Sequence, residues 1–374
     1  MRRILCGEYC AEILVAGLRR QFEELDVDPS AERFSPDRGC HCGPDGHRRF
    51  ICDALDRPKA RISRAKMDSL SIWGRVSGMS IARTNVVQAV VYEGSGITVR
   101  RLPAPRLASP LNVRIRVTTV GLCRTDLHVA SGLIAVEQPR ILGHEFAGRI
   151  VELGHGVAAK FKTGDQVSAN PLVPSKGGLL QVGVELDGAL ATEIVLPASQ
   201  LTRVSDSVAP RHCAYLEPLA AAMAPLSLDL PTSGRGFIPG DGRISILTRR
   251  AMRAAGFLQL HDAPEVDAYD FAIETGAHTI AAAVTALKPG GVLILKSRPH
   301  GNVALPLRDI LFKQLTVSPV LYGDFDIAAD WLANGTVLIE DLFGQSFSMN
   351  AASDAFSEAG RSEANKVFIE VSDP

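Results

Sequence analysis

The sequence predicts an α/β fold in which a β-rich lobe precedes an open parallel sheet flanked by helices. Short apolar runs bounded by Gly and Pro follow one another from about residue 87 to about residue 204. After Glu217 the pattern changes to strands that alternate with helices, which is typical of a parallel sheet. The 374 residues are enough for two hydrophobic cores of this kind.

Residues 1–84 differ in texture from the rest of the chain, and we expect a partly disordered extension there. Apolar residues at helical intervals predict one amphipathic helix over residues 1–25. Residues 26–64 are rich in Asp, Pro, Arg and Gly, which favours loop or disorder. Cys40 and Cys42 are spaced as Cys-x-Cys, unlike the Cys-x2-Cys pairs of zinc ribbons, so metal binding is the weaker interpretation of this segment.

The β-rich lobe is predicted from strands at even spacing. Their sequences are VVQAVVYEG, VRIRVTTVG, GRIVELG, DQVSAN, LATEIVLP and LTRVS. Such spacing is typical of a small barrel or sandwich.

The parallel lobe opens with a short strand over residues 236–240, a helix over residues 244–255 and a strand in FLQLHD. Gly240 and Gly242 stand in a dinucleotide-binding fingerprint, GDGRIS, whose third glycine is replaced by Ser245. Backbone N–H groups of this turn would face a pyrophosphate. Asp262 lies about 20 residues on, where an acidic side chain accepts the ribose 2′-hydroxyl and repels a 2′-phosphate, so NAD is preferred over NADP. The alternative is a plain glycine turn with a helix cap.

The parallel lobe also lacks a piece. From Asp262 the chain passes within a few residues to DAYDFAIETG, so a helix and a strand of about thirty residues are missing from a complete doubly wound sheet. The rest is regular: helices over residues 279–287, 307–314 and 327–333, and strands over residues 292–296 and 316–321.

Residues 120–148 carry the chemistry. Cys123, His144 and Glu145 offer a thiolate, an imidazole and a carboxylate, the ligand types of a catalytic zinc with one open position. Cys123 and His144 come from separate segments, so two loops would have to meet, which suits an open reactive site. Taken singly, a Cys is usually a small core residue and a His a satisfied polar group. The joint pattern favours metal.

GLCRTDLHV followed by GHEFAGRIVELG resembles the zinc-dependent, medium-chain alcohol and polyol dehydrogenases, near the sorbitol and threonine dehydrogenase branch. The resemblance continues through GDQV, DGALATEIVLPASQL, LEPLAAA, IETG, LKPGGVLIL and KVFIEV, and covers about Val87 to Val371. It implies a GroES-like catalytic domain over residues 85–218, a shortened Rossmann domain over residues 219–322 and a C-terminal return to the catalytic domain over residues 323–374.

The resemblance also implies roles for single residues. Cys123, His144 and Glu145 would be zinc ligands, with Glu217 as a fourth, direct or through water. Asp126 would orient a ligand. Thr125 and His128 would form a proton relay, and Arg124 would contact the cofactor's pyrophosphate. Many relatives carry four cysteines for a structural zinc in the segment that corresponds to residues 171–186; this chain has none there, so we expect one zinc.

These features lead to a zinc-dependent oxidoreductase that moves hydride between NAD(H) and a small secondary alcohol, polyol or amino alcohol. A zinc supplies Lewis acidity, and a hydroxyl and an imidazole carry the proton away. A second hypothesis is a non-catalytic relative with an impaired cofactor site, favoured by the shortened nucleotide domain and by Ser245. A third, a zinc-free quinone reductase relative, has no use for Cys123 and ranks last.

Composition excludes other classes. A formal net charge of −1 gives no sign of a nucleic-acid partner, and no apolar run reaches the ~18 residues of a membrane span. The N-terminus makes a poor signal peptide, so we expect a cytoplasmic protein whose seven cysteines are reduced or bind metal. A homodimer or homotetramer, paired through the strand over residues 316–321, is what the resemblance implies.

Overall fold

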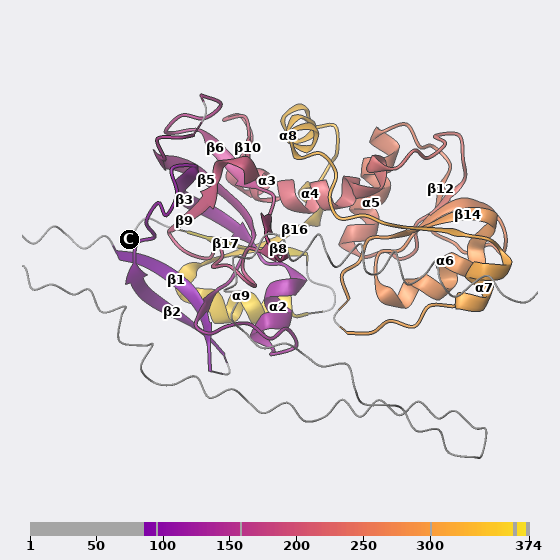
Figure 1. Cartoon of the computed structure of the whole chain (residues 1–374), viewed down its shortest axis with the longest axis horizontal. Coiled ribbons are helices and arrows are strands. Elements are labelled where there is room, and N and C mark those ends of the chain that lie inside the picture. The colour runs from indigo at the N-terminus through magenta and orange to yellow at the C-terminus, as the bar shows by residue number, and fades with distance from the viewer. Residues whose placement is uncertain (1–85, 95, 158, 300, 362–364, 372–374) are drawn as a thin grey trace, which may run out of the picture. The chain divides into compact units, whose positions relative to one another are not determined.

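The structure is a computed structural model that describes residues 86–94, 96–157, 159–299, 301–361 and 365–371 (Figure 1). The chain divides into two units, residues 1–77 and 78–374, and all described residues belong to the second. The helix, the loop and the cysteines expected in residues 1–84 lie outside the described residues.

The β-rich lobe is built on a seven-stranded sheet, ordered β10-β6-β5-β3-β17-β16 with β9 also paired to β3, and on a three-stranded sheet, β2-β1-β4. Along β3 the inward positions Val113, Ile115 and Val117 are buried, the period-two alternation of a strand that covers a core. The strands are β1 (Val86–Glu93), β2 (Gly96–Pro103), β3 (Asn112–Gly121), β4 (Arg140–Ile141), β5 (Glu145–Leu153), β6 (Gln166–Ala169), β9 (Glu193–Pro197), β10 (Leu201–Arg203), β16 (Phe343–Ser348) and β17 (Lys366–Glu370).

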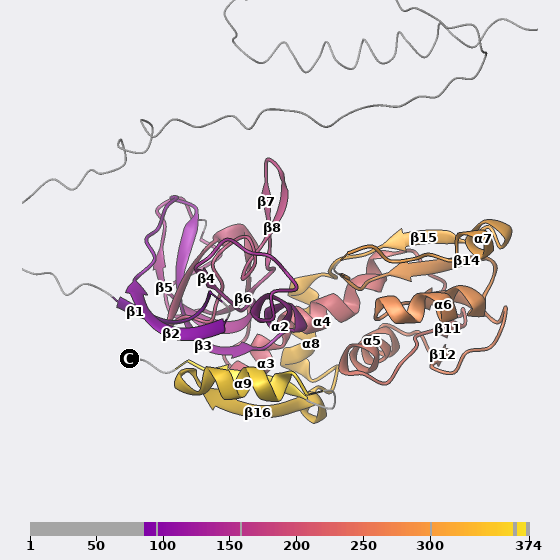
Figure 2. The ribbon, with the colours of Figure 1, turned by 90° about the horizontal axis from the view of Figure 1, so that it is seen from below.

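The cysteine-free segment 171–186 forms the hairpin β7 (Leu172–Ser175) and β8 (Gly178–Gln181), which projects from the lobe (Figure 2). The two cysteines among the described residues, Cys123 and Cys213, lie outside it. The hairpin is held by its backbone pairing and by Ser175, whose hydroxyl donates to the Gly178 carbonyl at 2.8 Å.

The second sheet is parallel throughout, in the order β12-β11-β13-β14-β15. Its strands are β11 (Gly236–Phe237), β12 (Leu260–His261), β13 (Tyr269–Ile273), β14 (Leu287–Leu295) and β15 (Thr316–Pro319). Only seven residues, 262–268, join β12 to β13, so β12 stands at the edge and the helix–strand unit judged missing from the sequence is indeed missing here.

The helices are α2 (Arg124–Ala130), α3 (Pro210–Ala214), α4 (Leu216–Met223), α5 (Arg243–Ala254), α6 (Ile280–Ala286), α7 (Leu307–Phe312), α8 (Phe325–Asn334) and α9 (Ala352–Ala359). Short 3-10 turns are η3 (Ala198–Gln200), η4 (Ala224–Ser227), η5 (Ala277–Thr279), η6 (Glu340–Leu342) and η7 (Met349–Ala351). Helix α4 lies between the two sheets (Figures 1 and 2), and its buried Leu216 and Leu219 share a core with Leu247 of α5 and Ala328 of α8.

Several predicted boundaries shift for local reasons. Helix α8 begins earlier than expected because the Asp324 side chain caps it, accepting the N–H groups of Asp326 and Ile327, and it ends where Gly335 adopts a left-handed φ of 66°. Helix α7 stops at Phe312, two residues before Gln314, which has a φ of 52°. The first strand of the sheet keeps only two of its five predicted residues.

Candidate metal and cofactor site

Asp126 ties together the two loops that carry the candidate ligands. Cys123 caps helix α2, and Asp126 in its first turn accepts the Cys123 N–H through Oδ2 at 2.9 Å. Its other oxygen, Oδ1, accepts the N–H of Gly143 at 2.9 Å. The carboxylate is 1% exposed, so both bonds are shielded from water. One side chain thereby fixes the residue before His144 relative to Cys123.

The structure brings Cys123, His144 and Glu145 together. One donor atom from each lies within 4.8 Å of the others, and no further group of three or more such residues occurs among the described parts of the chain. His144 and Glu145 are each 2% exposed, and Cys123 is half-buried. The three donors come from two separate segments of the chain.

The electrostatics of this cluster suit a cation. Burial by itself lowers the pKa of His144, but Cys123, Asp126 and Glu217 outweigh it and raise that pKa to about 10. This surrounding favours a positive charge at the site, which a proton or a metal ion can supply. A thiolate, an imidazole and a carboxylate are the donors that Zn²⁺ takes, so the residues fit this metal.

Glu145 has a partner that the sequence analysis missed. Lys366 of β17 donates from Nζ to Glu145 Oε2 at 2.5 Å and to the Leu122 carbonyl at 3.1 Å. Burial raises the pKa of Glu145, and Lys366 opposes that shift. A Cβ at Gly121 would lie 2.8 Å from the same carboxylate oxygen, so a glycine is needed beside the pair. The sequence signal that could have indicated this pair is Lys366 at the start of the apolar run KVFIEV.

Glu217 of α4 is buried at the same site but is not part of the three-residue group. The Tyr322 hydroxyl donates to Glu217 Oε1, and Arg298 donates to the Tyr322 oxygen at 2.9 Å. Arg298 also stacks on the Tyr322 ring, with its guanidinium carbon 4.5 Å from the ring centre. Tyr322 and Arg298 follow strands of the parallel sheet, so this chain of contacts connects the cluster to the second lobe.

The two predicted relay residues lie on α2. The Cys123 thiol donates to the Thr125 hydroxyl at 3.7 Å, which places Thr125 beside the cluster. His128 is half-buried one turn further along the helix. Arg124, in the first turn, is exposed.

The glycine fingerprint forms a tight turn between β11 and α5. Gly240 has a φ of 86°, which favours glycine, and Gly242 caps α5 with open space where a Cβ would stand. Ser245 replaces the third glycine and is buried: its Oγ donates to the Pro239 carbonyl at 2.9 Å and lies 2.8 Å from the Thr275 hydroxyl. The serine is thus accommodated by bonds inside the turn.

Asp262 lies one residue beyond β12 and is exposed. The charge of Asp262 acts on Arg249 of α5, which donates to the carbonyls of Ile238 and Gly240, both at 2.8 Å. Burial lowers the pKa of Arg249, and Asp262 opposes this shift, so the two charges sense each other.

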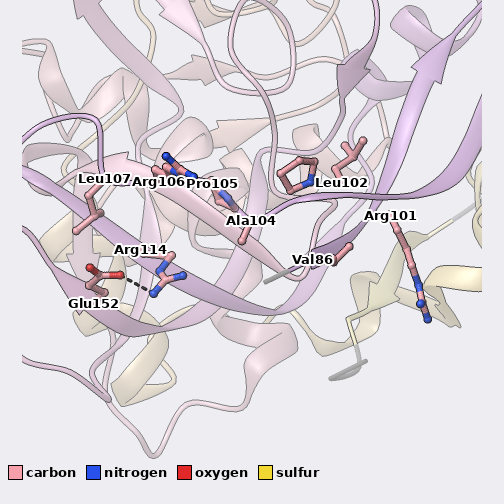
Figure 3. A pocket seen from close by; sticks show the side chains of 10 residues that line it. Val86, Arg101, Leu102, Ala104, Pro105, Arg106, Leu107, Arg114 and Glu152 are labelled. Carbon is pink, nitrogen blue, oxygen red and sulfur yellow. Dashed lines mark ion pairs between the residues drawn. The ribbon is translucent and has the colours of Figure 1, made fainter. Parts of the chain in front are cut away.

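A separate hollow lies on the β-rich lobe, at the end of β2 (Figure 3). Arg101, Arg106 and apolar residues line it, together with Arg114, which pairs with Glu152 at 2.5 Å. It contains none of the candidate ligands.

Helices in the described parts of the chain are all too short or too polar to cross a membrane. A β-rich lobe, a parallel sheet and a group of metal-type donors are together the features expected of a metal-dependent oxidoreductase. The family model "Alcohol dehydrogenase GroES-like domain" matches residues 109–206.

Curated relatives extend the match over the chain. A protein of Rhizobium meliloti (strain 1021) named D-xylulose reductase is 28% identical over 347 residues, covering 77% of this chain and 100% of the relative. Sorbitol dehydrogenase of Gallus gallus is 25% identical, covering 75% of this chain and 95% of the relative.

Solved structures share the fold. A zinc-binding dehydrogenase of Sinorhizobium meliloti 1021, bound to NADP, superposes with a TM-score of 0.69 at 24% identity and covers 76% of this chain and 99% of its own. 2R,3R-butanediol dehydrogenase of Bacillus subtilis has a TM-score of 0.67 at 22% identity and covers 76% and 99%. The family model, the curated relatives and the shared fold together support the medium-chain, zinc-dependent alcohol and polyol dehydrogenase family that the motifs predicted.

Proposed function

We propose that this protein is a zinc-dependent dehydrogenase that transfers hydride between a nicotinamide dinucleotide and a secondary alcohol of a small polyol. The observation that carries the proposal is the convergence of Cys123, His144 and Glu145 in one buried group. Relatives named xylulose reductase and sorbitol dehydrogenase direct the substrate class toward polyols.

Cys123, His144 and Glu145 or Glu217 would hold the zinc. When bound, the zinc supplies the Lewis acidity that polarises the alcohol oxygen. Asp126 holds the two ligand loops at a fixed separation. Each acidic candidate already has a partner, Lys366 for Glu145 and Tyr322 for Glu217, so which glutamate joins Cys123 and His144 depends on which of these contacts is broken.

Thr125 and His128 would move the proton. Thr125 lies beside Cys123, where its hydroxyl can accept the alcohol proton and pass it on. His128, on the same helix and half-buried, is the imidazole suited to release it near neutral pH.

The cofactor would bind along the carboxyl ends of the parallel strands, with its pyrophosphate at Gly240 and Gly242 and near Arg124. We propose NAD in preference to NADP, because the exposed Asp262 carboxylate would accept the ribose hydroxyls and repel a 2′-phosphate. The positive charge of Arg249 would favour the 2′-phosphate of NADP, but its Nη1 already donates to two backbone carbonyls.

The non-catalytic alternative rests on one specific feature, the edge position of β12. Without the missing strand and helix, one wall of the adenosine site is lost. A non-catalytic relative would keep zinc and fail to bind the cofactor.

Self-association is proposed through β15, for a homodimer or a homotetramer. Within the described residues β15 pairs only with β14, so its other edge is free. Leu311 and Phe312 nearby are 65% and 76% exposed. Sedimentation of the full chain would measure the mass, and a monomer would refute this part of the proposal.

The deciding experiment combines zinc analysis, NAD titration and turnover on xylitol and sorbitol. Zinc, cofactor binding and oxidation of at least one polyol together support the dehydrogenase. Zinc without cofactor binding would favour the non-catalytic alternative.

A further inference from the structure

A buried lysine stands at the carboxyl end of β14 and is not used by the proposed chemistry. Lys296 directly follows the strand and is 8% exposed. Its backbone is fixed, because the N–H groups of Lys296 and Ser297 donate to Glu274 Oε1 at 2.7 and 2.6 Å. The side chain is therefore held at a strand end where parallel sheets place their ligands.

The Lys296 ammonium has no direct partner within the described part of the chain: no hydrogen bond or ion pair joins its Nζ to another residue there. Two carboxylates, Glu217 and Glu274, act on it from a distance. Glu217 accepts the Tyr322 hydroxyl, and Glu274 Oε1 accepts two backbone N–H groups. Lysine is almost never buried without a pair, because removing its charge from water is costly.

Arg298, two residues further, adds a second positive charge on the same segment. Burial, followed by the charge of Arg298, lowers the pKa of Lys296. Glu217 acts on both cations, and Arg298 is connected to it through Tyr322, whose hydroxyl donates to the Glu217 carboxylate. Arg298 is held in place by the Tyr322 hydroxyl and by the Leu321 carbonyl, so among the described residues no carboxylate contacts it directly.

We propose that Lys296 and Arg298 form a subsite for an anionic group of the substrate, a carboxylate or a phosphate, next to the reacting alcohol. Two cations without carboxylate partners in a desolvated site attract an oxyanion strongly. The inference rests on the proposed dehydrogenase function and narrows its substrates to anionic polyols.

The cofactor's pyrophosphate is not the expected occupant. Its predicted site, the turn after β11, lies two strands away from β14 in the sheet, or about 10 Å at the usual strand spacing. Arg298 is instead connected through Tyr322 to Glu217, beside the candidate ligands. The anion therefore belongs to the molecule that reacts there.

The test compares xylitol, xylonate and xylitol 5-phosphate on the full-length protein. The second-order rate constant kcat/KM is measured for each compound with NAD, and binding of the two anions is measured by calorimetry. Variants are Lys296→Met, Lys296→Arg as the conservative replacement, and Lys288→Met as a matched control. Lys288 lies at the opposite end of β14, where it pairs with Asp270 at 2.8 Å.

We expect at least one anion to exceed xylitol by about tenfold in kcat/KM, and Lys296→Met to lower that ratio by about tenfold. Lys296→Arg should keep most of the ratio, and Lys288→Met all of it. The preferred anion shows whether the group is a carboxylate or a phosphate.

If the ratio of kcat/KM for the anion to that for xylitol is the same in the wild type and Lys296→Met, and both bind the anions equally well, the subsite is refuted. The proposed dehydrogenase function would not be affected. Absence of turnover with all three compounds, combined with anion binding that Lys296→Met weakens, would instead refute the dehydrogenase and support the anion site. Absence of both turnover and anion binding would overturn both. A purely structural role for Lys296 would change the thermal midpoint without changing the ratio.

Discussion

The carboxylate of Asp126 accepts the backbone N–H of Gly143 at 2.9 Å, 17 residues away along the chain, while its other oxygen caps the loop of Cys123. An amide in this position has only one acceptor oxygen and turns an NH2 group toward a backbone N–H. Asp126→Asn should therefore loosen both ligand loops and weaken zinc binding by about 10–100-fold, as changes to groups that orient metal ligands do.

Competition with a chelator measures that affinity. The matched control is Asp165→Asn, because Asp165 is also buried and also accepts a backbone N–H, that of Lys162, but is not in contact with the cluster. Equal zinc affinities for Asp126→Asn and wild type would show that the carboxylate is not needed to position the ligands.

Zinc stoichiometry is the second prediction. We expect one zinc per chain, lost in Cys123→Ala and retained in Cys213→Ala. Cys213 is fully buried, which raises the pKa of its thiol and keeps it from acting as a thiolate ligand. Elemental analysis of both variants measures the zinc content. Full zinc occupancy in Cys123→Ala would show that the metal is bound at another site.

The local parts of this site were predictable and the long-range parts were not. Cys123, Asp126 and His144 lie within 22 residues of one another, so a motif can record their arrangement. Lys366 contacts Glu145, 221 residues away along the chain, only because β17 pairs with β3, and no local pattern encodes that pairing. The Tyr322 contact with Glu217 likewise depends on how the second lobe meets α4.

The fold followed from periodicity for a similar reason. Strand and helix patterns are repeated many times, so α/β architecture and the missing unit after β12 were both visible in the sequence. The exact ends of the helices and strands were harder to predict, because they depend on single residues such as the capping Asp324 and the left-handed Gln314.

Cofactor choice is the third prediction. Asp262→Ala should weaken NAD binding by about 1–3 kcal/mol, the cost of leaving ribose hydroxyls without their partner. NADP binding should fall less or improve, because a negative charge is removed and Arg249 remains nearby. Fluorescence titration with both dinucleotides measures this, and equal losses would remove Asp262 from the cofactor site.

The fourth prediction concerns the relay. Thr125→Val should slow polyol oxidation more than His128→Gln does, because Thr125 is beside Cys123 and water can replace a half-buried imidazole. General acid–base groups contribute about 10²–10⁴-fold, and we expect the low end or less for His128. Its effect should be largest below neutral pH, where hydroxide is scarce. Turnover unaffected by Thr125→Val in a zinc-loaded enzyme would remove the relay.

The last prediction links Lys296 to stability. Burial, followed by Arg298, lowers the pKa of Lys296 from 10.5 to about 8. Below pH 8 the lysine is charged in both states, so the full cost of burying the charge is present. Between pH 8 and 10.5 the unfolded chain binds more protons than the folded one, so the free energy of unfolding rises with pH, by at most about 1.4 kcal/mol per pH unit.

Lys296→Met removes the titrating ammonium group. It should therefore also remove the contribution of that group to the pH dependence of the free energy of unfolding. The variant should therefore be more stable than wild type below pH 8, and the difference should shrink as the pH rises toward 10.5. Urea unfolding of both proteins across this range, with Lys288→Met as the exposed control, isolates the contribution from other titrating groups. Parallel curves would mean that Lys296 keeps its ordinary pKa through a partner of its own, and the uncompensated charge on which the anion subsite depends would be lost.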